Sequence, residues 1–167
     1  AQRDMESQIL DDMELERVIF PSVDKPFMCE RYVLKTNGGD KVVYIPEFIQ
    51  KVTTLAEKGV DGSYVIQASV QGAGTYKLKE GESLTFDVVF QAYRMSAAPL
   101  VADVAAEYAA RRKFVEDDID SALILNTPDP ILNEAFDHAL LNVEYAWLYP
   151  FGWIESIQHW PTMWHME

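Results

Sequence analysis

The sequence predicts an α+β protein in which a partial antiparallel β-sandwich is followed by two helices. Up to about residue 95, short alternating segments are separated by Gly-rich turns, which is typical of antiparallel sheets. From about residue 97 the apolar residues recur at helical spacing instead. The composition, 49% apolar and 25% charged over 167 residues, is that of a folded chain.

Segment 31–36 alternates apolar and polar residues. In all, six segments of the first part are expected to be strands: 16–20, 31–36, 41–45, 63–70, 75–78 and 83–93. The run Asn37-Gly38-Gly39-Asp40 is a strong turn signal, so segments 31–36 and 41–45 are predicted to form a hairpin. Six strands are few for a closed sandwich. We therefore expect part of a sandwich, which leaves open whether further strands precede it.

The stretch 71–76 (QGAGTY) superficially resembles a phosphate-binding loop. It lacks a third glycine and a following helix, and it lies between two predicted strands. A hairpin turn is the better interpretation.

The helical part begins with an apolar stripe that includes Val101, Val104, Tyr108 and Val115. The acidic run 116–120 that follows is expected to be a solvated linker, since it lacks the acid and glycine alternation of a calcium loop. Thr127-Pro128-Asp129-Pro130 then predicts a helix start, because proline at the first helical position sacrifices no hydrogen bond. The helix after it carries a broad apolar stripe between Ile131 and Trp147.

The net charge of −13 disfavours binding to nucleic acid or to an anionic membrane surface, so neither is an expected partner. No apolar run approaches the roughly 18 residues that span a bilayer. The one cysteine, Cys29, excludes an internal disulfide and is expected to pack as a small apolar side chain. These features do not indicate a compartment.

Aromatic residues are concentrated at the end of the sequence. All four tryptophans lie in the last 21 residues, interleaved with carboxylate, amide and imidazole groups. Sugar rings stack on aromatic faces while their hydroxyls need donors and acceptors, so a carbohydrate site is one interpretation. Packing in a core and a protein-contact surface are the other two. Pro150, Gly152 and Pro161 interrupt the helical period, which favours loops over a helical core.

His159 and His165 with Glu155 match no common zinc spacing, so no metal site is predicted. Ser156 and His159 lack the strand–turn–helix context of a nucleophilic serine.

Several segments resemble the start of an (α/α)6-toroid glycoside hydrolase domain: 125–136 (LNTPDPILNEAF), 142–147 (NVEYAW), 152–155 (GWIE), His159-Trp160 and 163–166 (MWHM). In such enzymes a β-sandwich and a helical linker precede the toroid. The resemblance implies a β-sandwich-like domain at 1–96, a helical linker at 97–127 and the truncated start of the catalytic domain at 128–167. It covers residues 120–167 well and residues 13–95 only diffusely.

The resemblance also implies which residues bind sugar. Trp153 and Trp160 would stack on sugar rings, Glu155 and His159 would bind hydroxyls, and Trp164 and His165 would line the same pocket. A toroid needs about twelve helices, and glycoside hydrolysis needs two carboxyl groups. We therefore expect a glycosidase fragment that supplies one wall of the pocket, with the catalytic acid and base outside this chain and no cofactor.

The alternative is a non-catalytic module that binds carbohydrate or another subunit. The expected partners are carbohydrate and, through an exposed toroid helix carrying Phe136, Leu140 and Trp147, a second copy or a completing chain.

Overall fold

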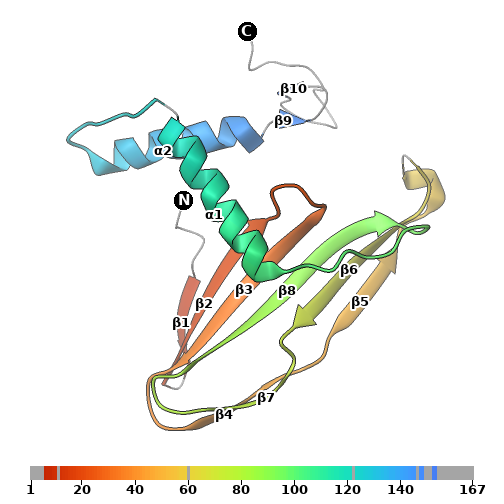
Figure 1. The fold of residues 1–167 in the computed structure, drawn as a ribbon, viewed down its shortest axis with the longest axis vertical. Helices are drawn as coiled ribbons and strands as arrows, with labels where there is room; N and C mark the ends of the chain where they lie inside the picture. Colours follow the sequence, from red (N-terminus) through yellow and green to blue (C-terminus); the bar gives the residue numbers. More distant parts are fainter. Residues whose placement is uncertain are drawn as a thin grey trace. The chain divides into compact units, whose positions relative to one another are not determined.

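The computed structural model describes residues 6–10, 12–59, 61–121, 123–145, 147–148 and 152–153, and the side chains of 12–59, 61–117 and 123–142. The chain is α+β, with antiparallel sheets in a sandwich-like arrangement and two helices (Figure 1). Its elements, in order, are β1 (Glu6–Leu10), β2 (Met13–Pro21), β3 (Phe27–Thr36), β4 (Lys41–Ile45), β5 (Ile49–Thr53), η1 (Ala56–Lys58), β6 (Tyr64–Gln71), β7 (Gly74–Leu78), β8 (Ser83–Arg94), α1 (Val104–Ser121), α2 (Pro130–Tyr145), β9 (Trp147–Leu148) and β10 (Gly152–Trp153).

The chain divides into two compact units, a β unit of residues 2–111 and a C-terminal unit of residues from 112 onward. The β unit holds a six-stranded sheet of order β1-β2-β3-β8-β6-β5 and a two-stranded sheet of β4 and β7, all antiparallel. The C-terminal unit holds α2 and the short β9–β10 pair.

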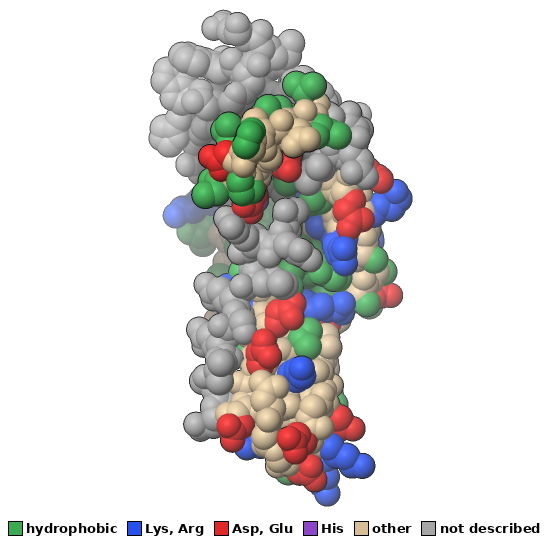
Figure 2. Space-filling view, turned by 90° about the vertical axis from the view of Figure 1, so that its left-hand side faces the viewer, with side chains coloured by type: hydrophobic (Ala, Val, Ile, Leu, Met, Phe, Trp, Pro, Cys, Tyr) green, Lys and Arg blue, Asp and Glu red, His purple; other side chains and the backbone are tan. Residues whose placement is uncertain are grey.

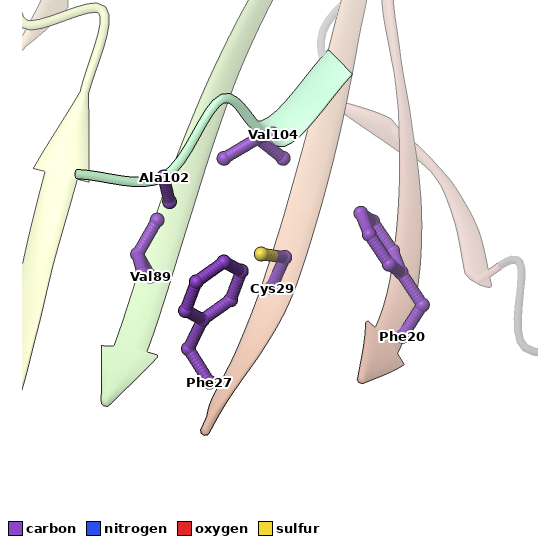
Figure 3. Packing of buried hydrophobic residues seen from close by; sticks show 6 residues of the cluster. All are labelled: Phe20, Phe27, Cys29, Val89, Ala102 and Val104. Carbon is purple, nitrogen blue, oxygen red and sulfur yellow. The ribbon is translucent and has the colours of Figure 1, made fainter. Parts of the chain in front are cut away.

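Alternation along the strands gives the six-stranded sheet two distinct faces, since residues directly opposite each other share a face. On one face Phe20, Cys29 and Val89 follow one another across β2, β3 and β8. They form the main core together with Phe27, with Ala102 from the segment before α1, and with Val104, the first residue of α1. Figure 3 shows Ala102 close to Val89, and Val104 above Cys29.

The second sheet packs on the other face at one end. Ile45 of β4 and Leu78 of β7 are buried against Leu84 of β8, with Val70 and Phe86 beside them. The opposite sides of β4 and β7 are exposed, as Val42 and Tyr44 show at 70% and 69%. This clean alternation is what a two-stranded ribbon with one covered face requires.

The predicted hairpin of 31–36 with 41–45 is wrong. β3 pairs with β2 and β8, whereas β4 pairs with β7. The end of β3 is instead tied to the turn before β8, because the Thr36 hydroxyl donates to the Lys79 carbonyl at 2.6 Å and the Gly81 amide donates to the Thr36 carbonyl. The chain does turn at residues 37–39, but the strand that follows, β4, belongs to the second sheet.

The predicted hairpin at 71–76 is also wrong, because β6 and β7 do not pair with each other. Gly72 follows β6 and Gly74 begins β7, with φ of 82° and 153°, a region that glycine adopts without a Cβ clash. A Cβ on Gly72 would also meet the Cβ of Phe86 at 3.3 Å. The glycines therefore redirect the chain from one sheet into the other.

The acidic run 116–120 lies within helix α1 and does not lead out of it. Arg112 and Lys113 form ion pairs with Glu116 and Asp117 one turn later, at 2.9 and 2.7 Å. Such pairs favour helix over coil by a few tenths of a kcal/mol each, on the order of 0.2–0.5. Val101, placed in the predicted helical stripe, lies before α1 and is 95% exposed.

The predicted helix start at Thr127–Pro130 is confirmed. Pro130 begins α2, and the Asp129 carboxylate accepts a hydrogen bond from the Ile131 amide at 2.9 Å. Asn133 adds a second tie, since its side chain accepts from the Thr127 amide and donates to the Thr127 carbonyl. The domain boundaries at 96 and 127 stay predictions.

Candidate functional site

The sequence-predicted sugar-binding residues fall almost entirely beyond the described part of the chain. Glu155, His159, Trp160, Trp164 and His165 lie outside it. Trp153 is described in its backbone alone, where it pairs with Trp147 across β10 and β9. Their roles therefore remain predictions.

Polar side chains meet where α1 joins the sheet of the β unit. This cluster, which we call the α1 anchor, consists of Ser22, Lys25, Arg31, Asp87 and Glu107. The residues come from the turn after β2, from β3, from β8 and from the first turn of α1. Sequence reasoning did not identify them, because no spacing along the chain signals contacts between residues more than 50 positions apart.

Glu107 is the centre of one half of the α1 anchor. It is 5% exposed, accepts a hydrogen bond from the Ser22 hydroxyl at 2.7 Å, and forms an ion pair with the Lys25 ammonium. The pKa of Glu107 is lowered mainly by the hydrogen bond from Lys25 and next by the one from Ser22. The hydrogen bond between Lys25 and Glu107 also raises the pKa of Lys25. Both groups are therefore held in their charged forms at neutral pH.

Arg31 and Asp87 form the other half, directly opposite each other on β3 and β8. The guanidinium donates from Nε to Oδ1 at 2.9 Å and from Nη2 to Oδ2 at 3.2 Å, a two-point contact that fixes both side chains. The Tyr108 ring lies 5.9 Å from the guanidinium carbon, within cation–π range. The hydrogen bond to Asp87 raises the pKa of Arg31.

The chemistry of the α1 anchor points to a structural role. A serine nucleophile needs a neutral base beside it, but the raised pKa of Lys25 keeps that amine protonated. A glycosidase general acid needs a raised carboxyl pKa, whereas that of Glu107 is lowered. The directions of these two pKa shifts favour a cluster that holds charges in place.

Cys29 lies beside the α1 anchor and is fully buried, as predicted for a small apolar side chain. Burial raises the pKa of its thiol to about 11, with Glu107 adding to the effect. The thiolate form that reacts is therefore scarce at neutral pH.

Glutamine side chains fasten the segment that leads into α1. Gln91 of β8 accepts from the Leu100 amide at 2.9 Å and donates to the Leu100 carbonyl at 3.3 Å. Gln71 of β6 donates to the Ala102 carbonyl at 3.0 Å. The segment at 100–102 is thereby bonded to the sheet although it is not a strand.

The face of the six-stranded sheet opposite α1 is apolar and only partly covered. We call the following residues of β2, β3, β8 and β6 the open face: Leu15, Ile19, Met28, Tyr32, Leu34, Phe86, Val88, Phe90, Ala92, Ile66, Ala68 and Val70. Tyr32 and Phe86 stack at 4.9 Å with their rings within 3° of parallel. Burial, then the hydrogen bond to Glu30, raises the pKa of Tyr32 to about 12.

A second apolar patch lies around the start of α2. Leu123, Ile124, Ile131 and Leu132 are between 51% and 76% exposed. Figure 2 shows hydrophobic side chains gathered near this helix start, whereas acidic and basic side chains mix over the lower part of the β unit. Among the described residues on the side shown, basic side chains form no continuous track for a polyanion to follow.

Among the described residues, no three His, Cys, Asp or Glu side chains gather as a metal site. The helices described include none that is long and apolar enough to cross a bilayer.

Comparisons of this chain with protein families, with curated proteins and with solved structures find no match.

Proposed function

We propose that this chain is the β domain, linker helix and first toroid helix of an (α/α)6 glycoside hydrolase that acts on oligosaccharides or polysaccharides. The observation that supports the proposal is the order of its elements. Eight strands precede the 18-residue helix α1, and α2 begins at Pro130, inside the motif that carries the resemblance. This is the order that a β domain, a linker and a toroid helix would have.

The α1 anchor and the glutamine contacts support the linker role. They fix the start of α1 to the sheet through Glu107, Gln91 and Gln71. The start of α1 is therefore part of the β unit.

In this proposal the pocket wall is the aromatic segment, with Trp153 and Trp160 as stacking residues, Glu155 and His159 as hydrogen-bonding residues, and Trp164 and His165 lining the same pocket. Hydrolysis by two carboxyl groups requires a protonated acid and an ionised base or nucleophile. Glu107 and Asp87 are already engaged by Lys25 and Arg31. We therefore assign the catalytic pair to other residues of the enzyme.

The test uses the protein that carries this sequence and a panel of aryl glycosides and oligosaccharides. Turnover is expected on at least one of them, and Trp153→Ala is expected to weaken sugar binding by about 1–3 kcal/mol with unchanged thermal unfolding. Tyr44→Ala removes an exposed aromatic ring from β4 and serves as the control, with no change in binding. Absence of turnover on the whole panel contradicts the hydrolase, and unchanged binding in Trp153→Ala removes that residue from the pocket.

A second candidate, a non-catalytic carbohydrate-binding or subunit-interaction module, is favoured by the open face, because exposed apolar patches mark contact surfaces. Sugar binding without turnover, or subunit binding without either, would support the module.

A further inference from the structure

Residues 100–108, which we call the latch, cover the sheet around Cys29. They comprise the segment before α1 and the first residues of the helix. Ala102 and Val104 belong to the same buried cluster as Cys29, and Figure 3 shows Val104 above it. Tyr108 packs against that cluster and is partly buried. Because Cys29 is 0% exposed, water and reagents reach its thiol only when part of this packing opens.

Polar contacts with the sheet hold the first part of the latch. Gln91 bonds to both main-chain groups of Leu100, and Gln71 donates to the carbonyl of Ala102. Leu100 and Val101 are 45% and 95% exposed, so these two apolar side chains add little burial. Hydrogen bonds that border on water contribute modestly to stability, because water replaces the lost partner when they open.

The helical part of the latch is held in a similar way. Glu107 accepts hydrogen bonds from Ser22 and Lys25, and the Lys25 side chain is 43% exposed. The Tyr108 ring adds an aromatic contact with the Phe20 ring at 5.3 Å. By contrast, β3, the strand that carries the thiol, is paired along both of its sides with β2 and β8.

The latch is bonded within itself and follows an exposed connection. The Asp103 carboxylate accepts from the Ala106 amide at 3.1 Å, and the Asp103 carbonyl accepts from the Glu107 amide at 2.9 Å. These bonds tie the first turn of α1 to the segment before it. Residues 94–99 are exposed at every position, and the boundary between the two compact units follows Arg111. Motion of the latch therefore does not require motion of the strands.

We infer that the latch opens and closes as a unit while the six-stranded sheet stays folded, and that its opening controls access to Cys29. Segments held by few apolar contacts and by hydrogen bonds that border on water open at a lower free energy than paired core strands. The same motion releases the start of α1. A group attached to the thiol in the open state occupies space that Val104 fills in the closed state, because the core leaves no room around Cys29. Modification of the thiol therefore keeps the latch open.

The test is alkylation of Cys29, the one cysteine of the sequence, by iodoacetamide in stepped urea, followed by intact mass. The thiolate displaces iodide and forms a carbon–sulfur bond, so each event adds one group. Sensitivity to urea grows with the surface that an opening exposes. Below the unfolding transition, the logarithm of the alkylation rate should rise with urea less than about half as steeply as that of the unfolding constant measured by circular dichroism. Equal slopes would mean that Cys29 is reached only through global unfolding and would overturn the inference.

Two latch variants and one control separate local from global opening. Without urea, Glu107→Gln should raise the alkylation rate roughly tenfold or more, the factor for a lost hydrogen bond to a charged group. Gln91→Ala, which removes both bonds to Leu100, is the second variant and should raise it roughly fivefold or more. Ile45→Val trims the other core cluster, lowers the stability of the β unit and should leave the rate within about twofold. An acceleration by Ile45→Val as large as that by the latch variants would contradict a local opening.

The alkylated chain tests whether the modified thiol keeps the latch open. Its circular dichroism should retain the sheet signal, whereas its Leu100 amide should exchange hydrogen about tenfold faster or more than in the unmodified chain. An unchanged exchange rate would show that the modified thiol fits beneath a closed latch and would overturn the coupling between the two. None of these results depends on sugar binding or turnover, so failure here leaves the proposed function standing.

Discussion

Glu107 and Lys25 form an ion pair between the first turn of α1 and the turn that joins β2 to β3, 82 residues apart in the chain. The carboxylate side is buried and the ammonium side is 43% exposed. With the Ser22 hydroxyl as a second donor, Glu107 holds the start of α1 on the sheet. The strength of this contact is measurable.

Glu107→Gln retains the shape of the side chain and removes its charge. The free energy of unfolding of the β unit should fall by about 1–3 kcal/mol, the range for a hydrogen bond to a charged group. Urea unfolding followed by circular dichroism measures it. Asp24→Asn is the control, since Asp24 lies 3.8 Å from the same ammonium but is 74% exposed, and it should cost at most about 0.5 kcal/mol. An equal fall in the free energy of unfolding in the two variants would show that the burial of Glu107 adds nothing to the stability of the ion pair.

The contribution of Glu107 should depend on pH in a known direction. Because its pKa in the folded chain is below the ordinary 4.5, its stabilisation is complete above about pH 4.5 and is lost as pH falls through the lowered value. The difference in unfolding free energy between the wild-type chain and Glu107→Gln should be constant from about pH 7 to about pH 5 and shrink in stronger acid. Unfolding curves at stepped pH measure it, and a difference undiminished at about pH 2 would contradict this origin.

In alkaline solution the pH dependence of the ion pair runs in the opposite direction, because Lys25 and not Glu107 loses its charge there. The pKa of Lys25 is raised above 10.5, so its stabilisation is complete below that pH and is lost as pH rises through the raised value.

Gln91→Ala should loosen the segment before α1. The substitution removes both hydrogen bonds to Leu100, so the unfolding free energy should fall by about 1–2 kcal/mol. Hydrogen exchange of the Leu100 amide should also become about tenfold faster or more, because this amide loses its acceptor. Gln50→Ala, on the fully exposed strand β5, is the matched control and should change neither quantity. An unaltered exchange rate in Gln91→Ala would mean that Leu100 is protected by other contacts.

Asp129→Ala removes the side-chain cap of α2. Loss of such a cap costs about 0.5–2 kcal/mol, so helix signal should melt at a lower temperature in this variant. Asp117→Ala removes an exposed carboxylate that pairs with Lys113 and should cost about 0.5 kcal/mol or less. Thermal scans by circular dichroism compare the two, and a smaller effect for Asp129→Ala than for Asp117→Ala would exclude the cap.

Where the chemistry is local, sequence reasoning succeeded. The start of α2 was predicted at Thr127–Pro130 because the effect of a proline on a helix start is confined to the first turn. The burial of Cys29 was likewise predicted from its apolar neighbours. The prediction that the acidic run 116–120 leads out of the helix is wrong, because Arg112 and Lys113 one turn earlier form ion pairs with Glu116 and Asp117.

Where partners are distant, sequence reasoning failed. The turn at 37–40 was recognised, but its flanking strands β3 and β4 pair with β8 and β7. β1 and β5 were missed as well. β5 is exposed at every position, so the apolar alternation that marks a half-buried strand is muted.

The sequence by itself determined the α+β class, the change from strands to helices near residue 97, and the start of α2, because periodicity and the effect of proline depend on neighbours along the chain. Tertiary structure alone decided that Glu107 meets Lys25, that Arg31 meets Asp87, and that one sheet face is packed while the other is open. These relations arise when strands choose partners across tens of residues. That choice depends on the burial of whole faces, to which each short segment contributes only a part.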